Sequence, residues 1–415
     1  MKDVRHLRRR IMGLGMAAVL PSPVWLSASG AALAQVPGTR GSPQGVASAG
    51  LTRVSFATNW KAQAAHGGFY QAVADGTYRQ VGLDVTIVQG GPAVNNRPLL
   101  PAGRIDFLMT GNLLHSFDNL RNQVPTVVVA AMFQKDPQAL MAHPGQGYED
   151  FTALKRAPVA FIAKDAQFTW WAWLKAVHGF RDEQLKPYNY NLAPWLSNPK
   201  SIQQGYAVAE PIYAQRQGGF KPVVHLLADH GFSTYSTVIE TRRELVDKRP
   251  DLVQRFVDGS ILGWTQYLHG DPQAAHAMMR RDNPDMGEEE LMASRQRLLD
   301  NAIVEAGDSL KLGIGAMRRE RAADFLQQMV RAGLYKAGQV DVGAVLVESF
   351  VNKGVGLDLR RRLLEPRRAT RPAQEESHAR QRHLRHGSCG APVRHRSPGH
   401  GAAQRLVQLP LDADL

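Results

Sequence analysis

Residues 52–88 decide the fold, and their sequence is TRVSFATNWKAQAAHGGFYQAVADGTYRQVGLDVTIV. Apolar, β-favouring runs at residues 54–57 and 83–88 predict two strands, and apolar side chains at helical spacing predict a helix over residues 67–80 between them. A strand, a helix and a strand in this order are typical of a parallel sheet with helices on its faces. Ligands of such sheets bind beyond the carboxyl ends of the strands, and residues 59–66 fall at one of these ends.

The alternation of strands and helices continues along the chain. Further strands are predicted over residues 105–109, 126–132 and 159–162. Helices are predicted over residues 95–102, 113–122, 169–177, 244–269 and 273–281. This pattern predicts an α/β fold of two lobes joined at a hinge, with a helical C-terminal segment. We place lobe I with these C-terminal helices at residues 52–143 and 224–357, and lobe II at residues 144–223.

The N-terminus has the three parts of an export signal. A basic start to Arg10 precedes an apolar stretch from Ile11, and small residues follow at positions 32–34. We expect a signal peptide over residues 1–34 and a disordered lead-in over residues 35–51. The arginines before Ile11 also resemble a twin-arginine signal, so the export route stays open. No cysteine stands beside the cleavage point, and we expect an untethered periplasmic protein.

Composition excludes several classes of protein. Most of the net charge of +13 comes from the basic N-terminus and the arginine-rich C-terminus, so no nucleic-acid partner is expected. No uninterrupted apolar run reaches the roughly 20 residues of a membrane span. The single cysteine, Cys389, excludes an intramolecular disulfide, a redox pair and a cysteine zinc cage. We expect no metal site among the tail histidines, because arginines surround them: His378, His383, His386, His395 and His400.

Several separated motifs resemble periplasmic substrate-binding proteins of the nitrate/sulfonate/taurine class, and more narrowly their thiamine-pyrimidine branch. The resemblance runs from about Thr52 to about Leu357. It is carried by NWKAQAAHGGFY at 59–70, GLDV at 82–85, AGRIDF at 102–107, QGYAVAEP at 204–211, LLADHG at 226–231, RPD at 249–251 and GIG at 313–315. The resemblance implies a two-lobed type II periplasmic-binding-protein clamshell that traps a small molecule between its lobes.

The resemblance also implies a function. We expect a monomeric receptor, without a cofactor, that delivers a small molecule to an ABC permease and its ATPase. The expected ligand is a thiamine-precursor pyrimidine or a similar small heteroaromatic. Riboflavin, a sulfonate, nitrate and an aromatic carboxylate are the alternatives within this class.

Candidate ligand-binding residues of lobe I follow its predicted strands. Trp60, Gln63 and His66 offer an aromatic face and polar groups, with a core role for Trp60 and a helix cap for His66 as alternatives. Gly90 and Gly91 either bring backbone close to a ligand or make a turn. The end of the strand over 105–109 and the helix after it add Thr110, Asn112 and His115, of which Asn112 is also a candidate helix cap.

In lobe II the best polar candidate is Glu210. Its carboxylate would accept hydrogen bonds from the amino group and ring N–H of a protonated aminopyrimidine, although an acid at a helix start is the alternative. An aromatic cluster lies at the start of the helix over 169–177, and no single helix face can bury all of it: Phe168, Trp170, Trp171 and Trp173. We assign Trp170 to the cleft, together with Tyr235.

An enzyme on the same clamshell is the alternative of a different class. A pyrimidine synthase of this wider family needs a lysine that holds pyridoxal phosphate four residues before a histidine, and a cysteine-rich segment for iron. His115 matches the histidine, but Gly111 stands at the lysine position and the folded region has no cysteine. The chain also lacks the Gly-x-Ser-x-Gly and His-Glu-x-x-His motifs of hydrolases. We therefore expect no enzyme and assign no catalytic residue.

Residues 358–415 depart from the family and predict a basic, disordered tail. Arg, Pro, His, Gly and Ala dominate it without apolar periodicity. A lipid-binding extension, a nucleic-acid arm and translation in a wrong reading frame of a GC-rich gene are the three explanations, and we favour the last.

Deletion of residues 366–415 should leave folding and ligand affinity unchanged, because this composition cannot contribute to a packed core. Thermal unfolding of the truncated and full-length chains, with and without ligand, measures this. A large drop in melting temperature on truncation would refute the interpretation.

Overall fold

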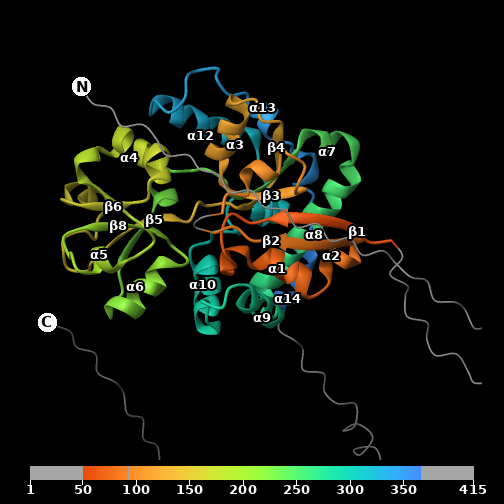
Figure 1. Cartoon of the computed structure of the whole chain (residues 1–415), viewed down its shortest axis with the longest axis horizontal. Coiled ribbons are helices and arrows are strands. Elements are labelled where there is room, and N and C mark those ends of the chain that lie inside the picture. The colour runs from red at the N-terminus through yellow and green to blue at the C-terminus, as the bar shows by residue number, and fades with distance from the viewer. Residues whose placement is uncertain (1–49, 92–93, 366–415) are drawn as a thin grey trace, which may run out of the picture. The chain divides into compact units, whose positions relative to one another are not determined.

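The computed structural model describes residues 50–91 and 94–365, in which ten strands form two five-stranded mixed sheets with helices around them (Figure 1). The expected signal peptide, the lead-in as far as residue 49 and the tail from residue 366 lie outside the described residues. The chain is therefore an α/β protein, as the alternation of strands and helices predicts.

The first sheet has the strand order β2-β1-β3-β10-β4. β1 pairs in parallel with β2 and β3, whereas β10 is antiparallel to both of its neighbours, β3 and β4. Its strands are β1 (Thr52–Ala57), β2 (Leu83–Val88), β3 (Phe107–Asn112), β4 (Thr126–Phe133) and β10 (Ser236–Arg242). The bounds of β2 are those predicted, and β3 lies two to three residues later than predicted.

The second sheet has the order β7-β6-β8-β5-β9. β6 is parallel to β7 and β8, and β5 is antiparallel to β8 and β9. Its strands are β5 (Gln138–Ala142), β6 (Ala160–Ile162), β7 (Leu185–Pro187), β8 (Ile202–Tyr206) and β9 (Val223–Leu226). β5 belongs to the second sheet although it lies before the expected lobe boundary at residue 143. The chain therefore changes sheets earlier than expected, between Phe133 and Gln138.

The two antiparallel strands follow from how the chain passes between the sheets. It leaves the first sheet after β4, enters the second at β5, and returns from β9 to β10. β10 arrives from the second lobe and therefore runs in the opposite direction to β4, which leads toward that lobe. The predicted parallel sheet is for this reason a mixed one. The carboxyl ends of β1 and β3 consequently point toward the second lobe, and those of β6 and β8 point toward the first.

The helices and 3₁₀ turns fill the connections. The α-helices are α1 (Gly67–Ala74), α2 (Thr77–Gln80), α3 (Leu113–Arg121), α4 (Trp170–His178), α5 (Ala193–Leu196), α6 (Glu210–Gly218), α7 (Arg243–Lys248), α8 (Pro250–His269), α9 (Gln273–Asp282), α10 (Glu288–Asp300), α11 (Ser309–Leu312), α12 (Arg319–Arg331), α13 (Val342–Val345) and α14 (Leu357–Leu364). The 3₁₀ turns are Ala64–His66, Arg97–Leu99, Phe151–Arg156, Asp165–Phe168, Asp182–Gln184, Leu227–His230 and Glu348–Phe350. None of the helices in this part of the chain has the length and apolar character that a bilayer-spanning segment requires.

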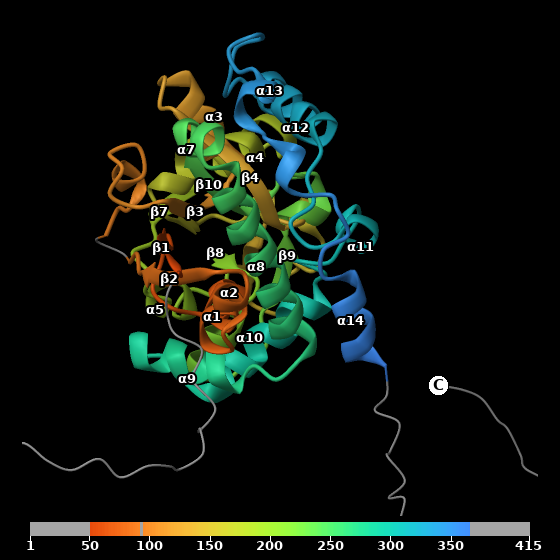
Figure 2. The same ribbon diagram turned by 90° about the vertical axis from the view of Figure 1, so that its right-hand side faces the viewer.

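Two helical predictions differ from the structure. The helix predicted over residues 67–80 is divided, because Gly76 adopts φ +80° and Asp75 Oδ1 accepts hydrogen bonds from the Thr77 backbone N–H (2.9 Å) and hydroxyl (2.6 Å). The expected disorder from residue 358 is wrong for its first residues, since these form α14. This helix packs against α8 (Figure 2), and Arg360 Nε donates to Glu305 Oε1 at 2.7 Å.

The core of the first lobe is built on β4 and α8. All eight residues of β4 are buried, as their continuous apolar sequence predicts. Phe256 of α8 stacks on Phe107 of β3, with ring centroids 4.0 Å apart. On the other side α8 lies close against α1, where a side chain on Gly263 would place its Cβ 2.3 Å from the Gly68 carbonyl oxygen. Glycine is therefore required at this helix contact.

The two passages between the sheets are joined by Arg321 and by the ion pair of Lys135 with Asp229, whose atoms lie 2.8 Å apart. Arg321 of α12 donates to the backbone oxygen of Gln134 in the first passage and to that of Ser233 in the second, the latter at 3.2 Å. Its guanidinium also lies 4.2 Å from the centroid of the Tyr235 ring. Arg321 therefore holds both passages at a fixed separation.

Gly263→Ala should lower the free energy of unfolding by about 1–3 kcal/mol or more, because the new methyl group collides with backbone that cannot move away. Urea denaturation of the purified protein measures the change. Gly91→Ala is the matched control, since its Cβ would meet only ordinary contacts at 3.8 Å and 3.9 Å. Equal effects of the two substitutions would contradict this reason.

Candidate functional site

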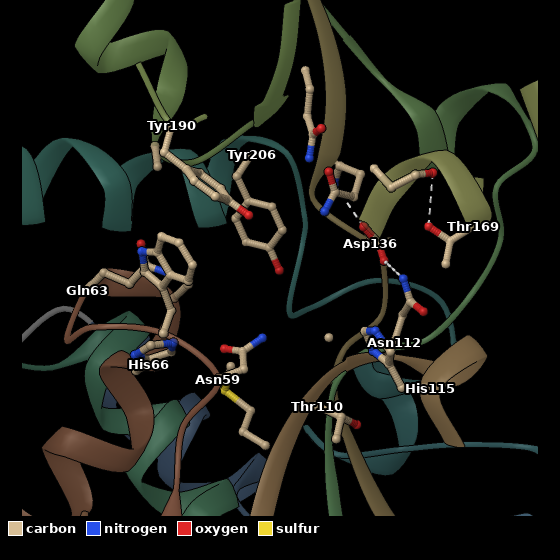
Figure 3. Close-up of a pocket in the computed structure, with 18 of the residues that line it drawn as sticks. Asn59, Gln63, His66, Thr110, Asn112, His115, Asp136, Thr169, Tyr190 and Tyr206 are labelled. Carbon is tan, nitrogen blue, oxygen red and sulfur yellow. Dashed lines mark hydrogen bonds between the residues drawn. The ribbon is translucent and has the colours of Figure 1, made fainter. Parts of the chain in front are cut away.

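A cavity of about 350 Å³ lies between the two lobes. It is lined by the loop after β1, the end of β3, the start of β5, the segment before α4, and the end of β8 (Figure 3). These are the strand ends at which the alternating pattern places a ligand. The cavity is therefore built by residues of both sheets.

One wall of the cavity is aromatic. Trp60 of the first lobe meets Tyr190 of the second, with ring centroids 4.9 Å apart and an angle of 47° between the planes. Tyr188 lies 5.3 Å from Tyr190, and the buried Trp170 also lines the cavity. Planar π-faces from both lobes can thus contact a flat ligand.

Two uncharged histidines face the cavity. His66 is fully buried, and neither of its ring nitrogens has a hydrogen-bond partner among the described residues. Burial lowers the pKa of His66 to about 3. Burial and the nearby charge of Arg97 lower the pKa of His115 to about 4, and its Nδ1 also has no partner in the described part of the chain. Buried polar atoms are normally hydrogen-bonded, so these atoms indicate where a ligand would donate or accept.

Asp136 lies in the first passage between the sheets, on the side of the cavity opposite Gln63 and His66 (Figure 3). Its Oδ2 accepts from Asn112 Nδ2 at 2.8 Å, and its Oδ1 accepts from the Gln138 backbone N–H at 2.9 Å. Burial raises the pKa of Asp136 to about 6, against the opposing effect of these hydrogen bonds. The carboxylate is thus held in place by neutral donors.

Glu210 stands at the first position of α6. Its Oε2 accepts from the Tyr206 backbone N–H at 2.7 Å, and its Oε1 accepts from the Tyr188 hydroxyl at 3.4 Å. Burial raises the pKa of Glu210, against the opposing effect of hydrogen bonds from backbone N–H groups and Tyr188. Glu210 therefore stabilises the turn between β8 and α6 and also lines the cavity. Its position agrees with both alternatives from the sequence, an acid at a helix start and a residue that faces the ligand.

The residues that line the cavity include one basic side chain of fixed charge. This is Arg97, which is exposed and donates to Asn119 Oδ1 at 3.0 Å. No lysine or cysteine is among the described lining residues, and in the described part of the chain no group of three or more potential ligands could hold a metal ion. The site thus offers aromatic faces, neutral polar atoms and two acids.

Most of the predicted site residues meet in this one cavity: Trp60, Gln63, His66, Thr110, Asn112, His115, Trp170 and Glu210. Gly90, Gly91 and Tyr235 do not line it. A Cβ on Gly90 would lie 2.5 Å from the Asn59 carbonyl carbon, so this glycine serves backbone packing. Gly91 forms an isolated bridge with Val94, and the buried Tyr235 hydroxyl accepts from the Arg318 backbone N–H at 2.9 Å.

The aromatic run before and in α4 is buried on more than one side. Trp170 lines the cavity, Trp171 Nε1 donates to Asp182 Oδ1 at 3.1 Å, and Trp173 packs against Phe232 at 5.2 Å between ring centroids. The side chain of Phe168 lies outside the described part. The expectation that one of these rings reaches the cleft thus agrees with the position of Trp170.

Sequence reasoning missed several lining residues, among them Asn59, Arg97, Asp136, Gln138, Tyr188, Tyr190, Gln204 and Tyr213. Tyr188 and Tyr190 follow the three-residue strand β7, which has no detectable periodicity. Asp136 follows the buried run of β4, and its position at a strand end was the available signal. Tyr206, inside the quoted QGYAVAEP motif, is a lesser aromatic candidate from the sequence, and it lines the cavity.

The strand orders of the two sheets, the two passages between them and the cavity at the strand ends define the type II periplasmic binding protein fold. The aliphatic sulphonate binding protein SsuA from Escherichia coli is 13% identical over 71% of this chain and 92% of its own, with a TM-score of 0.53. The nitrate-binding protein NrtA from Synechocystis PCC 6803 is 14% identical over 76% and 89%, with a TM-score of 0.51. SsuA from Xanthomonas axonopodis pv. citri, bound to MOPS, is 13% identical over 72% and 100%, with a TM-score of 0.52.

Residues 63–275, just over half of the chain, match the protein family described as NMT1/THI5 like. The chain belongs to this family. Among curated proteins, none matches it.

The two cavity histidines should make the free energy of unfolding fall as the pH is lowered from about 7 to about 4. In the folded protein they stay uncharged down to pKa values of about 3 and 4, whereas the unfolded chain binds these protons near pH 6.5. Each histidine therefore contributes a slope of up to about 1.4 kcal/mol per pH unit. His66→Gln should reduce the pH slope of the free energy of unfolding by the contribution of His66. Urea denaturation at several pH values measures this slope.

Gln63→Asn is the control for this slope, since it alters a cavity side chain without removing a titratable group. Asp136 acts in the opposite direction, because its raised pKa favours the folded state in acid, but it is present in both variants. A slope in His66→Gln equal to that of the wild type would show that His66 is not held neutral.

Proposed function

We propose that this protein is an exported solute-binding receptor that delivers a small, flat heteroaromatic compound to an ABC importer. A thiamine-precursor pyrimidine that bears an amino group is the proposed ligand. The observation that carries the proposal is the cavity between the lobes, in which aromatic rings and a carboxylate from different segments face one space. A ligand held by both lobes stabilises their closed arrangement, which is how such a receptor would signal its loaded state.

The size of the cavity supports a small ligand. About 350 Å³ lies at the lower end of the roughly 300–1,000 Å³ of small-molecule sites, which suits a single heteroaromatic ring better than riboflavin. Trp60 and Tyr190 would stack on the ring. The amino group would donate to Glu210 Oε1, which accepts the long 3.4 Å hydrogen bond of the Tyr188 hydroxyl.

The charge of the cavity argues against nitrate, a sulfonate or an aromatic carboxylate as the ligand. Such anions are normally held by arginine or by several backbone N–H groups. Here Arg97 is at the surface and already bonded to Asn119, whereas the buried Asp136 and the half-buried Glu210 lie beside the ligand space. An anion would have to approach two acids.

The residue at position 111, a glycine, supports the proposal of a receptor rather than a synthase of the same fold. Gly111 lies beside His115, where an added Cβ would be 3.3 Å from His115 Cε1, and glycine cannot form a Schiff base. His115 is then available as a neutral hydrogen-bonding group of the cavity. The export signal expected over residues 1–34 supports a periplasmic location, and a monomer that docks on an ABC permease completes the proposal.

Hydroxymethylpyrimidine (4-amino-5-hydroxymethyl-2-methylpyrimidine) should raise the melting temperature of the purified protein after refolding has removed any bound ligand. A ligand at 100 times its Kd adds about 2.7 kcal/mol to the free energy of unfolding, which shifts the melting temperature by several degrees. Formylaminopyrimidine, thiamine, riboflavin, taurine and nitrate are compared under the same conditions. A shift only with an anion or with the flavin would retain a receptor and overturn the ligand, and no shift with any compound would contradict the receptor.

Glu210→Gln and Trp60→Ala should each weaken pyrimidine binding at least tenfold, because one loses the charged acceptor and the other the stacking face. Isothermal titration calorimetry gives the affinities. Glu289→Gln, an exposed position on α10, and Trp60→Phe, which keeps an aromatic ring, should stay within about threefold of the wild type. Wild-type affinity in Glu210→Gln would remove this residue from the site.

A further inference from the structure

The cavity contains a buried carboxylate, Asp136, besides the half-buried Glu210. The side chain of Asp136 is 1% exposed. Neither acid forms an ion pair with a basic side chain of the described residues, and hydrogen bonds from neutral groups are the interactions that lower their pKa values. Buried charges in proteins are normally paired, so two unpaired acids in one cavity require an explanation.

The two carboxylates lie near the same side chain. Burial raises the pKa of Tyr206, and the charges of Asp136 and of Glu210 both raise it further. Tyr206 therefore lies close enough to both acids to sense their charges. One acid belongs to the passage between the sheets and the other to the first turn of α6, so a ligand between them would contact both moving parts of the protein.

The groups around Asp136 do not neutralise it. From β3 comes Asn112, from α3 the uncharged His115, from β10 Ser236, from β8 Tyr206, and across the cavity the uncharged His66. The adjacent Lys135 is paired with Asp229 at 2.8 Å, and Arg321 is bonded to backbone oxygens. The other buried acids of the described residues have a basic side chain nearby and do not line the cavity: Glu240 has the charge of Arg97 near it, and Glu290 pairs with Arg216.

We propose that Asp136 is a specificity-determining residue that, together with Glu210, selects a ligand carrying a positive charge when bound. The ligand class is a flat heteroaromatic cation that carries an amino group, and its positive charge lies between the two carboxylates. The Asn112 side chain and the Gln138 backbone N–H each donate to one carboxylate oxygen of Asp136, and they fix the orientation of this carboxylate before a ligand binds. The inference rests on the proposed function in that it concerns the same cavity.

A permanent cation and its neutral isostere test the inference directly. 4-Amino-1-methylpyridinium and 4-methylaniline have the same shape and amino group and differ in charge. The cation should bind the wild-type protein at pH 7 at least tenfold more tightly than the neutral compound, as measured by calorimetry. Equal affinities, or tighter binding of the neutral compound, would overturn the inference.

The pH dependence of cation binding gives a second measure, which needs no variant. Asp136 is mostly ionised at pH 7 and mostly protonated at pH 5, so affinity for the cation should fall at least about tenfold between these values. His66 and His115 remain neutral over this range and do not contribute. An affinity that is independent of pH would contradict the inference.

Asp136→Asn should weaken the cation at least tenfold and reduce its pH dependence, while 4-methylaniline changes less than threefold. A purely structural role of Asp136 would weaken both compounds alike. Asp358→Asn, which removes an acid from an exposed ion pair on α14 outside the cavity, is the matched control. In Glu210→Gln the affinity for the cation should still fall between pH 7 and pH 5, because Asp136 still becomes protonated over this range.

The failures of the two proposals are distinguishable. Binding of hydroxymethylpyrimidine without any preference for the cation contradicts the inference and keeps the proposed function. Preference for the cation without pyrimidine binding keeps the inference and replaces the proposed ligand. Absence of binding by either isostere at pH 7, when hydroxymethylpyrimidine also fails to bind, contradicts both.

Discussion

The structure depends on one guanidinium group. Arg321 donates to the backbone of both passages that connect the sheets and lies on the ring of Tyr235, so it fixes the separation of the passages together with the Lys135–Asp229 ion pair. The first passage holds both Gln134, which Arg321 binds, and Asp136, which lines the cavity. The position of the cavity carboxylate and the geometry of the hinge are therefore fixed by the same short segment, and a charge placed beside Asp136 acts where lobe movement begins.

The sequence predicts the scaffold well where patterns are regular. The strand over residues 83–88 and the buried strand from residue 126 follow from β-favouring apolar runs, and the helix from Leu113 follows from its spacing and from Asn112 as its cap. The antiparallel β10 could not be predicted, because its direction is set by the return of the chain from the other lobe. The division of the predicted helix at Gly76 needed the side chain of Asp75, whose capping bonds favour a new helix start.

Prediction of the cavity lining was most complete directly after a predicted strand, and the quoted motif and the aromatic run added Glu210 and Trp170. Trp60, Gln63 and His66 were found because a parallel strand locates its own carboxyl end. Asp136 and Tyr190 belong to irregular segments whose place in the cavity depends on tertiary structure. Gly90 lies outside this cavity, and a glycine required by the backbone of Asn59 looks the same in sequence as one required by a ligand.

The unpartnered imidazole of His66 has a consequence for how this cavity can change its ligand over evolution. With no described group bonded to either nitrogen, the protein does not select between the two neutral tautomers. The bound molecule selects the tautomer, so the same side chain can present a donor or an acceptor at either position. A heterocycle with its ring nitrogen and amino group exchanged could be accommodated without a substitution at residue 66. A change of ligand within this scaffold then needs substitutions at the acids and the aromatic wall, and none at His66.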